Sequence, residues 1–147
     1  AANKGAFEAG AQSVGLNIQL PFEQRINPYV KKSAAFYYFF SRKVMLTAPA
    51  NAFVFFPGGF GTLDEFFEVV DYIEMGYMQK VPIVLVGKEF WEGLKNWILE
   101  VMLERHHNIN AEDLNLFHIT DDPDEVPHII NQFYKERPEE LSQNFGL

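Results

Sequence analysis

The sequence contains no cysteine in 147 residues, which excludes disulfide bonds and thiolate metal sites. No apolar run approaches the roughly 20 residues that a membrane-spanning helix needs, and we see no signal peptide. Basic residues are also few, because 12 Lys and Arg stand against 20 Asp and Glu and give a formal net charge of −8. This charge argues against nucleic acid or an anionic membrane as the main partner. We therefore expect a cytoplasmic protein.

Two common phosphate-binding motifs are missing as well. A dinucleotide-binding G-x-G-x-x-G fingerprint would need a third glycine after Gly59 and Gly61, and Asp64 stands at that position. A Walker A loop would need Gly-Lys-Ser/Thr, and this tripeptide does not occur. The four histidines show no spacing typical of metal ligands. We predict no metal and no cofactor.

The most informative stretch is Pro-Gly-Gly-Phe-Gly-Thr-Leu-Asp-Glu, residues 57–65. It follows the apolar run 52–56, which indicates a buried strand, and leads into 65–73, where apolar residues recur with helical spacing. Glycines let the backbone turn sharply and approach a ligand, and the free N–H groups of a helix N-terminus attract an anion. The pattern predicts a phosphate-binding turn.

The rest of the chain alternates strands with helices, which favours one α/β domain over residues 1–147. Such a pattern predicts a Rossmann-like, doubly wound parallel sheet in a three-layer α/β/α fold, with ligands outside the carboxyl ends of the strands. Residues 22–32 are expected to form a loop and 138–147 a flexible tail. We expect strands over 13–20, 35–40, 52–56, 81–86 and 116–120, and helices over 1–9, 42–48, 65–73, 90–105 and 123–137.

Glu65, Arg42 and Lys43 carry charge near the expected helix starts. Thr62 and Glu65 have the T-x-x-E spacing of a capping box, so Glu65 is either a cap or a carboxylate facing the phosphate. The Arg42-Lys43 pair is unfavourable at a helix start unless a phosphate or carboxylate compensates it, and the alternative is an exposed basic pair. In the 22–32 loop, Glu23 and Gln24 are either ordinary loop polarity or part of a pocket.

The motif P-G-G-x-G-T-x-x-E is matched here at all its fixed positions, and the segments 1–6 and 15–24 add to the match. The chain thereby resembles the LONELY GUY (LOG) family of nucleoside 5′-monophosphate phosphoribohydrolases, which also carries an older label as possible lysine decarboxylases. The resemblance implies hydrolysis of the N-glycosidic bond of AMP or a cytokinin riboside monophosphate, giving free base and ribose 5-phosphate. It also implies a homodimer.

The same resemblance assigns roles to individual residues. Glu65 and Arg42 match the two catalytic residues of the family. The phosphate-binding residues would be Gly58, Gly59, Gly61, Thr62 and Lys43, and the pocket residues would be Glu23, Gln24 and Asn3. An alternative is a nucleotide or molybdenum-cofactor carrier of the same superfamily that performs no catalysis. Lysine decarboxylation is the poorest interpretation, since we find no site for pyridoxal phosphate.

In LOG-like sequences the helix that begins here at Ala1 follows a Gly-Gly-Gly-x-Gly-x-Met turn, two strands and a further helix. We therefore expect an N-terminally truncated fragment that lacks the N-terminal strands of the fold. Such a fragment should bind nucleotide weakly and show little or no hydrolase activity. It should also bury its exposed sheet edge against a partner chain.

Overall fold

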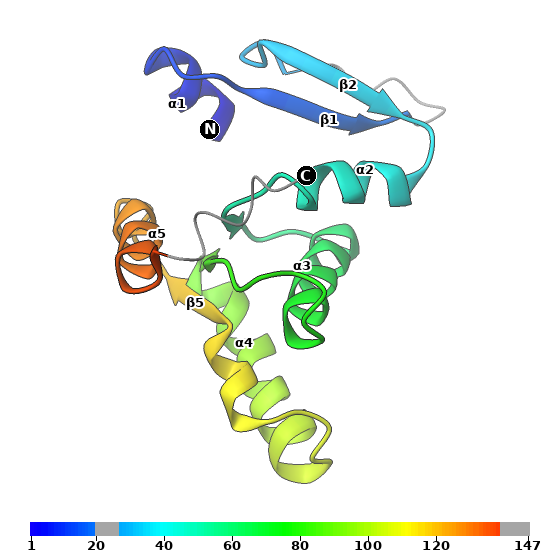
Figure 1. Ribbon diagram of the computed structural model, residues 1–147, viewed down its shortest axis with the longest axis vertical. Coiled ribbons are helices and arrows are strands. Elements are labelled where there is room, and N and C mark those ends of the chain that lie inside the picture. Colours follow the sequence, from blue (N-terminus) through cyan, green and yellow to red (C-terminus); the bar gives the residue numbers. More distant parts are fainter. Residues whose placement is uncertain (20–26, 139–147) are drawn as a thin grey trace. The chain divides into compact units, whose positions relative to one another are not determined.

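The computed structural model describes residues 1–19 and 27–138. The chain divides into two compact units, Ala1–Pro49 and Ala50–Leu147, which we describe separately (Figure 1). Both units consist of parallel strands and helices, which confirms the α/β, Rossmann-like class with helices flanking parallel sheets. The described strands are hydrogen-bonded in two sheets, one of two strands and one of three. The arrangement of residues 1–147 as a single domain stays a prediction.

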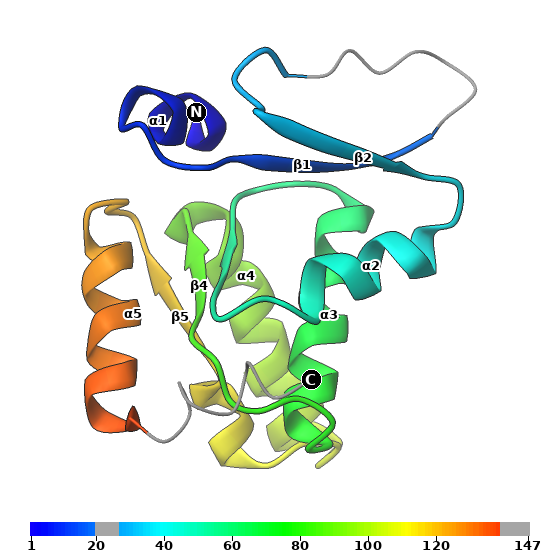
Figure 2. The same ribbon diagram turned by 45° about the horizontal axis from the view of Figure 1, so that its top comes forward.

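The first unit contains a two-stranded parallel sheet and two helices, visible in Figure 2. Strands β1 (Val14–Ile18) and β2 (Lys32–Phe36) pair in register from Val14 opposite Lys32 to Ile18 opposite Phe36. Helix α1 (Ala2–Glu8) precedes them, and Gly10 follows it with a φ of +72°, the left-handed conformation that ends many helices. The predicted helix over 1–9 and strand over 13–20 are thus confirmed in their described parts.

The predicted boundary between the second strand and its helix was wrong. The strand ends at Phe36, and helix α2 (Phe39–Thr47) begins three residues before the predicted start at 42. The N-cap is Tyr38, and the Ser41 hydroxyl donates to the carbonyl oxygen of Tyr38 from within the first turn. The last two residues of the aromatic run 36–40, Phe39 and Phe40, thus begin the helix, whereas Phe36 ends the strand.

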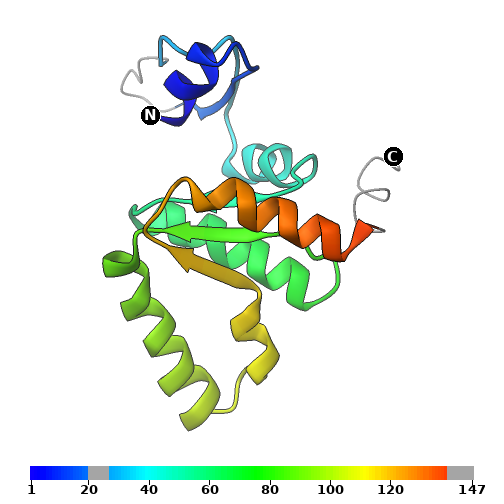
Figure 3. The ribbon, with the colours of Figure 1, turned by 90° about the vertical axis from the view of Figure 1, so that its left-hand side faces the viewer.

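The second unit contains the three-stranded parallel sheet, in the order β3-β4-β5. These strands are β3 (Phe53–Phe55), β4 (Ile83–Val86) and β5 (Phe117–Thr120), close to their predicted positions. Helices α3 (Phe60–Glu74) and α4 (Lys88–Trp97) cover one face, while α5 (Glu125–Glu136) covers the other, as Figure 3 shows. This is the three-layer arrangement expected from the alternation of strands and helices.

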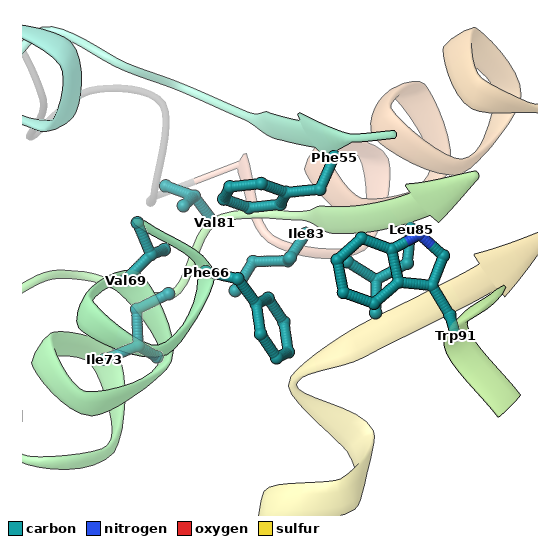
Figure 4. Packing of buried hydrophobic residues seen from close by; sticks show 8 residues of the cluster. All are labelled: Phe55, Phe66, Val69, Ile73, Val81, Ile83, Leu85 and Trp91. Atoms are coloured by element: carbon teal, nitrogen blue, oxygen red, sulfur yellow. The ribbon is translucent and has the colours of Figure 1, made fainter. Parts of the chain in front are cut away.

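The core of this unit lies between the sheet and the helices α3 and α4. Phe66 of α3 is fully buried, with its ring centroid 5.7 Å from that of Phe55, 5.6 Å from that of Trp91 and 5.4 Å from that of Phe117 (Figure 4). The Trp91 indole N–H donates to the carbonyl oxygen of Val86 at 3.2 Å, which satisfies its buried polar atom. These contacts hold α3 against the sheet, and the glycine-rich turn leads directly into this helix.

Two further helices differ from their expected bounds, and one short helix was not expected. The helix predicted over 90–105 begins at Lys88 and continues from Ile98 to Arg105 as the π-helix η1. A 3₁₀-helix, η2 (Ala111–Asn115), precedes β5 and was not predicted. The last helix, expected over 123–137, spans Glu125–Glu136 with Asp124 as its N-cap. In the turn before it, the Asp122 carboxylate accepts the Asp124 N–H at 2.9 Å.

Candidate active site

The glycine-rich turn connects the carboxyl end of β3 to the first turn of α3. The helix begins at Phe60 with Gly59 as its N-cap, five residues before the predicted start. The N–H groups of Thr62 and Leu63 both return to the carbonyl oxygen of Gly59, at 3.0 and 3.2 Å. Residues 60–65 of the motif are therefore helical, and the N–H groups of Phe60 and Gly61 precede the first returning bond and face the open end of the helix.

The capping-box interpretation of Glu65 is wrong. A capping box needs Thr62 at the N-cap and Glu65 three residues later, but Thr62 is the third residue of the helix and Glu65 the sixth. No side chain makes a capping hydrogen bond at this helix start. Glu65 lies half-buried, next in sequence to the fully buried Phe66 of the same helix.

Gly58 is required by a close packing contact inside the turn. A Cβ atom at Gly58 would lie 2.1 Å from Thr62 Oγ1 and 2.8 Å from Thr62 Cβ. Both distances are shorter than real non-bonded contacts, so the Thr62 side chain occupies the space that a larger residue would need. The two motif residues thus form one packed unit, which holds the turn in a single shape.

Gly59 and Gly61 have no such packing reason to be glycine. A Cβ atom at either position would meet nothing within 4 Å, and neither residue has a positive φ. Their lack of a side chain leaves the backbone bare on the open side of the turn. This is the arrangement that lets a ligand oxygen reach backbone N–H groups directly.

The turn after β4 packs against the glycine-rich turn, and the helix that begins there is capped by a carboxylate. Gly87, after β4, has a φ of +107°, and a Cβ atom there would lie 3.1 Å from Pro57 Cγ, so this glycine lets the two turns pack together. The Asp121 carboxylate, after β5, accepts the Lys88 N–H at 2.7 Å and caps α4. Helix α3 has no acidic residue in its first turn. Among these helix starts, α3 is the one suited to an anion.

Arg42 and Lys43 lie in α2 of the first unit and are half-buried. The Arg42 Nε–H donates to the carbonyl oxygen of Leu16 in β1 at 2.7 Å, which ties the guanidinium to the sheet. The Lys43 carbonyl oxygen accepts a hydrogen bond from the Thr47 hydroxyl at 2.9 Å. The backbone partner of Arg42 was missed by sequence reasoning, since it lies 26 residues away along the chain.

Asn3 takes part in a side-chain network within the first unit. Its amide nitrogen donates to Ser13 Oγ at 3.0 Å, and its amide oxygen accepts from Asn27 at 3.5 Å. The Ser13 hydroxyl in turn donates to the carbonyl oxygen of Tyr29 at 3.3 Å. This network joins α1 to the turn that leads into β2. The other predicted pocket residues, Glu23 and Gln24, lie outside the described residues, as does most of the predicted tail.

The predicted residues therefore fall into two groups, each placed by its own unit. The residues at the turn and start of α3 lie in the second unit and are Gly58, Gly59, Gly61, Thr62 and Glu65. The remaining described residues, Arg42, Lys43 and Asn3, lie in the first unit. Over residues 1–19 and 27–138, no three His, Asp or Glu side chains gather in a way that would hold a metal ion. In the same ranges no helix is long and apolar enough to cross a bilayer.

The fold and the turn together define an α/β protein in which a glycine-rich helix start follows the carboxyl end of a parallel strand. Residues 1–130 match the model of the family described as "Possible lysine decarboxylase". The chain belongs to this family, which is the LOG family that the motif indicated.

Two curated relatives are both named cytokinin riboside 5′-monophosphate phosphoribohydrolase. The protein from Rhodococcoides fascians is 33% identical over 63 residues, which cover 43% of this chain and 32% of the relative. The protein from Mycobacterium marinum is 38% identical over 60 residues, which cover 41% of this chain and 32% of the relative. The chain thus matches about a third of the length of each.

Proposed function

We propose that the protein hydrolyses the N-glycosidic bond of a nucleoside 5′-monophosphate, AMP or a cytokinin riboside monophosphate, to free base and ribose 5-phosphate. The observation that carries the proposal is the uncapped, acid-free start of α3 with bare glycines at 59 and 61. Family membership and the names of the two relatives point to the same chemistry.

The 5′-phosphate would bind at this turn. The backbone N–H groups of Phe60 and Gly61 offer donors, and the positive end of the α3 dipole favours an anion. Gly58 and Thr62 would act by holding the shape of the turn, since their atoms pack on each other. The resemblance adds Lys43 as a further phosphate contact. Substrate selection would then depend on the phosphate, so a nucleoside should be a much poorer substrate than its monophosphate.

Glu65 would perform the chemistry. When the bond from C1′ to the base nitrogen breaks, its electron pair leaves with the base and positive charge develops on the ribose. A fixed carboxylate stabilises that charge, and it can take a proton from the water whose oxygen bonds to C1′. The absence of a capping box at this helix start supports this role, because helix capping does not explain a glutamate at position 65. Arg42, held by Leu16, would bind phosphate or assist the departing base.

The test is product analysis of the natural full-length protein against a panel of nucleotides and matching nucleosides. We expect release of base and ribose 5-phosphate from a purine 5′-monophosphate, with little release from the nucleoside. Equal rates on both would remove the phosphate-binding role of the turn. Tight nucleotide binding with no base release would favour the carrier function instead.

We also propose that the protein is a cytoplasmic homodimer. The support is the family resemblance and the exposed aromatic run of the first unit, in which Tyr37, Tyr38, Phe39 and Phe40 are between 59% and 76% exposed. Monomeric proteins rarely leave so much contiguous apolar surface uncovered.

A further inference from the structure

The outer edge of β5 combines open backbone groups with a groove between two helices. In the three-stranded sheet β5 pairs with β4 alone, so within residues 27–138 no strand covers its other side. The Thr120 carbonyl oxygen accepts the Gly87 N–H at 2.8 Å and therefore points toward β4. Since successive residues of a strand point their backbone groups to alternate sides, the N–H and C=O groups of Phe117 and Ile119 point outward.

A cavity of about 410 Å³ lies along this edge. Its two helical walls differ in character. Helix α4 contributes the exposed side chains of Lys88, Glu92 and Lys95, and α5 contributes the apolar side chains of Ile129 and Phe133. The α4 wall therefore carries a net positive charge in a protein whose formal net charge is −8. One side of the groove attracts acidic groups, and the other attracts apolar ones.

We propose that this groove binds an extended peptide segment of another protein, in which acidic and apolar residues alternate. The peptide would add a strand to the sheet through the outward N–H and C=O groups of Phe117 and Ile119. Its alternate side chains would point to opposite faces of the sheet. The acidic ones would contact Lys88 and Lys95, and the apolar ones would pack on Ile129 and Phe133.

A later strand of the same chain is a poor candidate for this position. Helix α5 covers the face opposite to α3 and α4 (Figure 3). The connections from β3 to β4 and from β4 to β5 are right-handed and carry α3 and α4 on one face. A further right-handed connection in the same direction would place its helix on that face too. A parallel strand formed after α5 at the outer edge of β5 would therefore require a left-handed connection, which is rare.

A second copy of the chain also fits poorly. Two β5 edges can pair symmetrically only in antiparallel fashion, about a two-fold axis perpendicular to the sheet. This operation keeps α4 of both copies on the same face, so two groove walls with the same net positive charge would lie side by side. Like charges placed together oppose the pairing, whereas an acidic partner satisfies them.

The test is an NMR titration of the ¹⁵N-labelled protein with the peptide acetyl-Glu-Val-Glu-Val-Glu-Val-amide, up to about 1 mM to cover weak binding. The control peptide has Lys in place of Glu. We expect the acidic peptide to shift the amide signals of Phe117 and Ile119 more than those of His118 and Thr120. The lysine peptide should bind at least about tenfold more weakly.

Charge reversal supplies the matched variants. Lys88→Glu combined with Lys95→Glu should weaken binding of the acidic peptide about tenfold or more and strengthen binding of the lysine peptide. Lys135→Glu changes an exposed lysine of α5 outside the groove and should alter binding by less than about twofold. Unchanged circular dichroism of each variant verifies its fold.

Four results would overturn the proposal. The first is the absence of binding by the acidic peptide, and the second is equal binding of the two peptides. The third is a shift of the Phe117 and Ile119 signals with protein concentration alone, which would identify a second copy as the occupant. The fourth is slow hydrogen exchange of these two amides without any peptide, which would identify residues 139–147 or another part of the chain.

Discussion

Replacing Gly58 by alanine tests whether the glycine-rich turn, where we propose that phosphate binds, is held by the packing of Thr62. The added Cβ atom would lie 2.1 Å from Thr62 Oγ1, 2.8 Å from Thr62 Cβ and 3.2 Å from Thr62 Cγ2. Rotation of the threonine can move Oγ1 and Cγ2, but Cβ is attached to the helix backbone. The turn or the first turn of α3 must therefore shift.

Overpacking of this kind lowers the free energy of unfolding by about 1–3 kcal/mol. The matched control is Gly61→Ala, because a Cβ atom at Gly61 meets nothing within 4 Å and the residue is already helical. Alanine in a helix is more stable than glycine by about 0.5–1 kcal/mol. Gly61→Ala should therefore leave stability equal or higher, while its methyl group intrudes where the phosphate would approach and weakens substrate binding.

Urea denaturation gives the two free energies of unfolding, and the nucleotide assay gives the two activities. We expect Gly58→Ala to lose stability and activity, and Gly61→Ala to lose activity alone. Thr62→Gly, which deletes all three clashing atoms, should remove most of the penalty of Gly58→Ala in a double-mutant cycle. Unchanged stability of Gly58→Ala would refute the packing of Gly58 against Thr62. Unchanged activity of Gly61→Ala would refute the approach of the phosphate to the backbone at Gly61.

Three further predictions concern other parts of the chain. Arg42→Lys keeps the positive charge but lacks the Nε–H that donates to the Leu16 carbonyl. We expect both Arg42→Lys and Arg42→Ala to reduce kcat/KM by at least about tenfold. Full activity of the lysine variant would show that the positive charge alone matters. His107 follows η1 with a φ of 53°, a left-handed conformation that favours glycine, and the Asn108 N–H bonds the Met102 carbonyl at 2.8 Å. His107→Gly should therefore raise the free energy of unfolding by about 0.5–1 kcal/mol in urea denaturation. A loss of stability would contradict this. The intact protein should have a dimeric mass in light scattering, and a monomeric mass at all micromolar concentrations would argue against the homodimer.

The sheet of the second unit was predictable because its strands carry a strong local signal. All four residues of β4, Ile83–Val86, are buried, so the apolar run in the sequence translates directly into a central strand. Helical spacing places Phe66 and Ile73 on one face of α3, and both are buried. Long-range packing reinforces local preference at these positions.

The start of α3 was not predictable in the same way. Its first turn contains Gly61 and is preceded by Gly59, and glycines in sequence indicate a turn rather than a helix. The cap that sequence reasoning assigned to Thr62 is absent, since the Thr62 side chain packs on Gly58. Sequence identified the motif correctly but misplaced the helix start within it, and that start determines which N–H groups face the open end.

Contacts between distant residues account for the remaining differences. The hydrogen bond from Arg42 to Leu16 joins residues 26 apart, and the cap that Asp121 provides for α4 spans 33 residues. The π-helical winding of η1 has no local sequence signal of its own. These features depend on how strands and helices meet, so spacing rules that consider one element at a time do not reveal them.

The central claim is that Glu65 catalyses base release from a nucleoside 5′-monophosphate bound at the α3 turn. The most direct measurement is the rate of free base release from AMP and from a cytokinin riboside monophosphate by the full-length protein and its Glu65→Gln variant, each normalised to folded protein. Glutamine is nearly isosteric but carries no charge to stabilise the developing cation. We expect the rate to fall at least about 100-fold, or about 2.7 kcal/mol of transition-state stabilisation, with the free energy of unfolding nearly unchanged. Normal turnover by folded Glu65→Gln would contradict it.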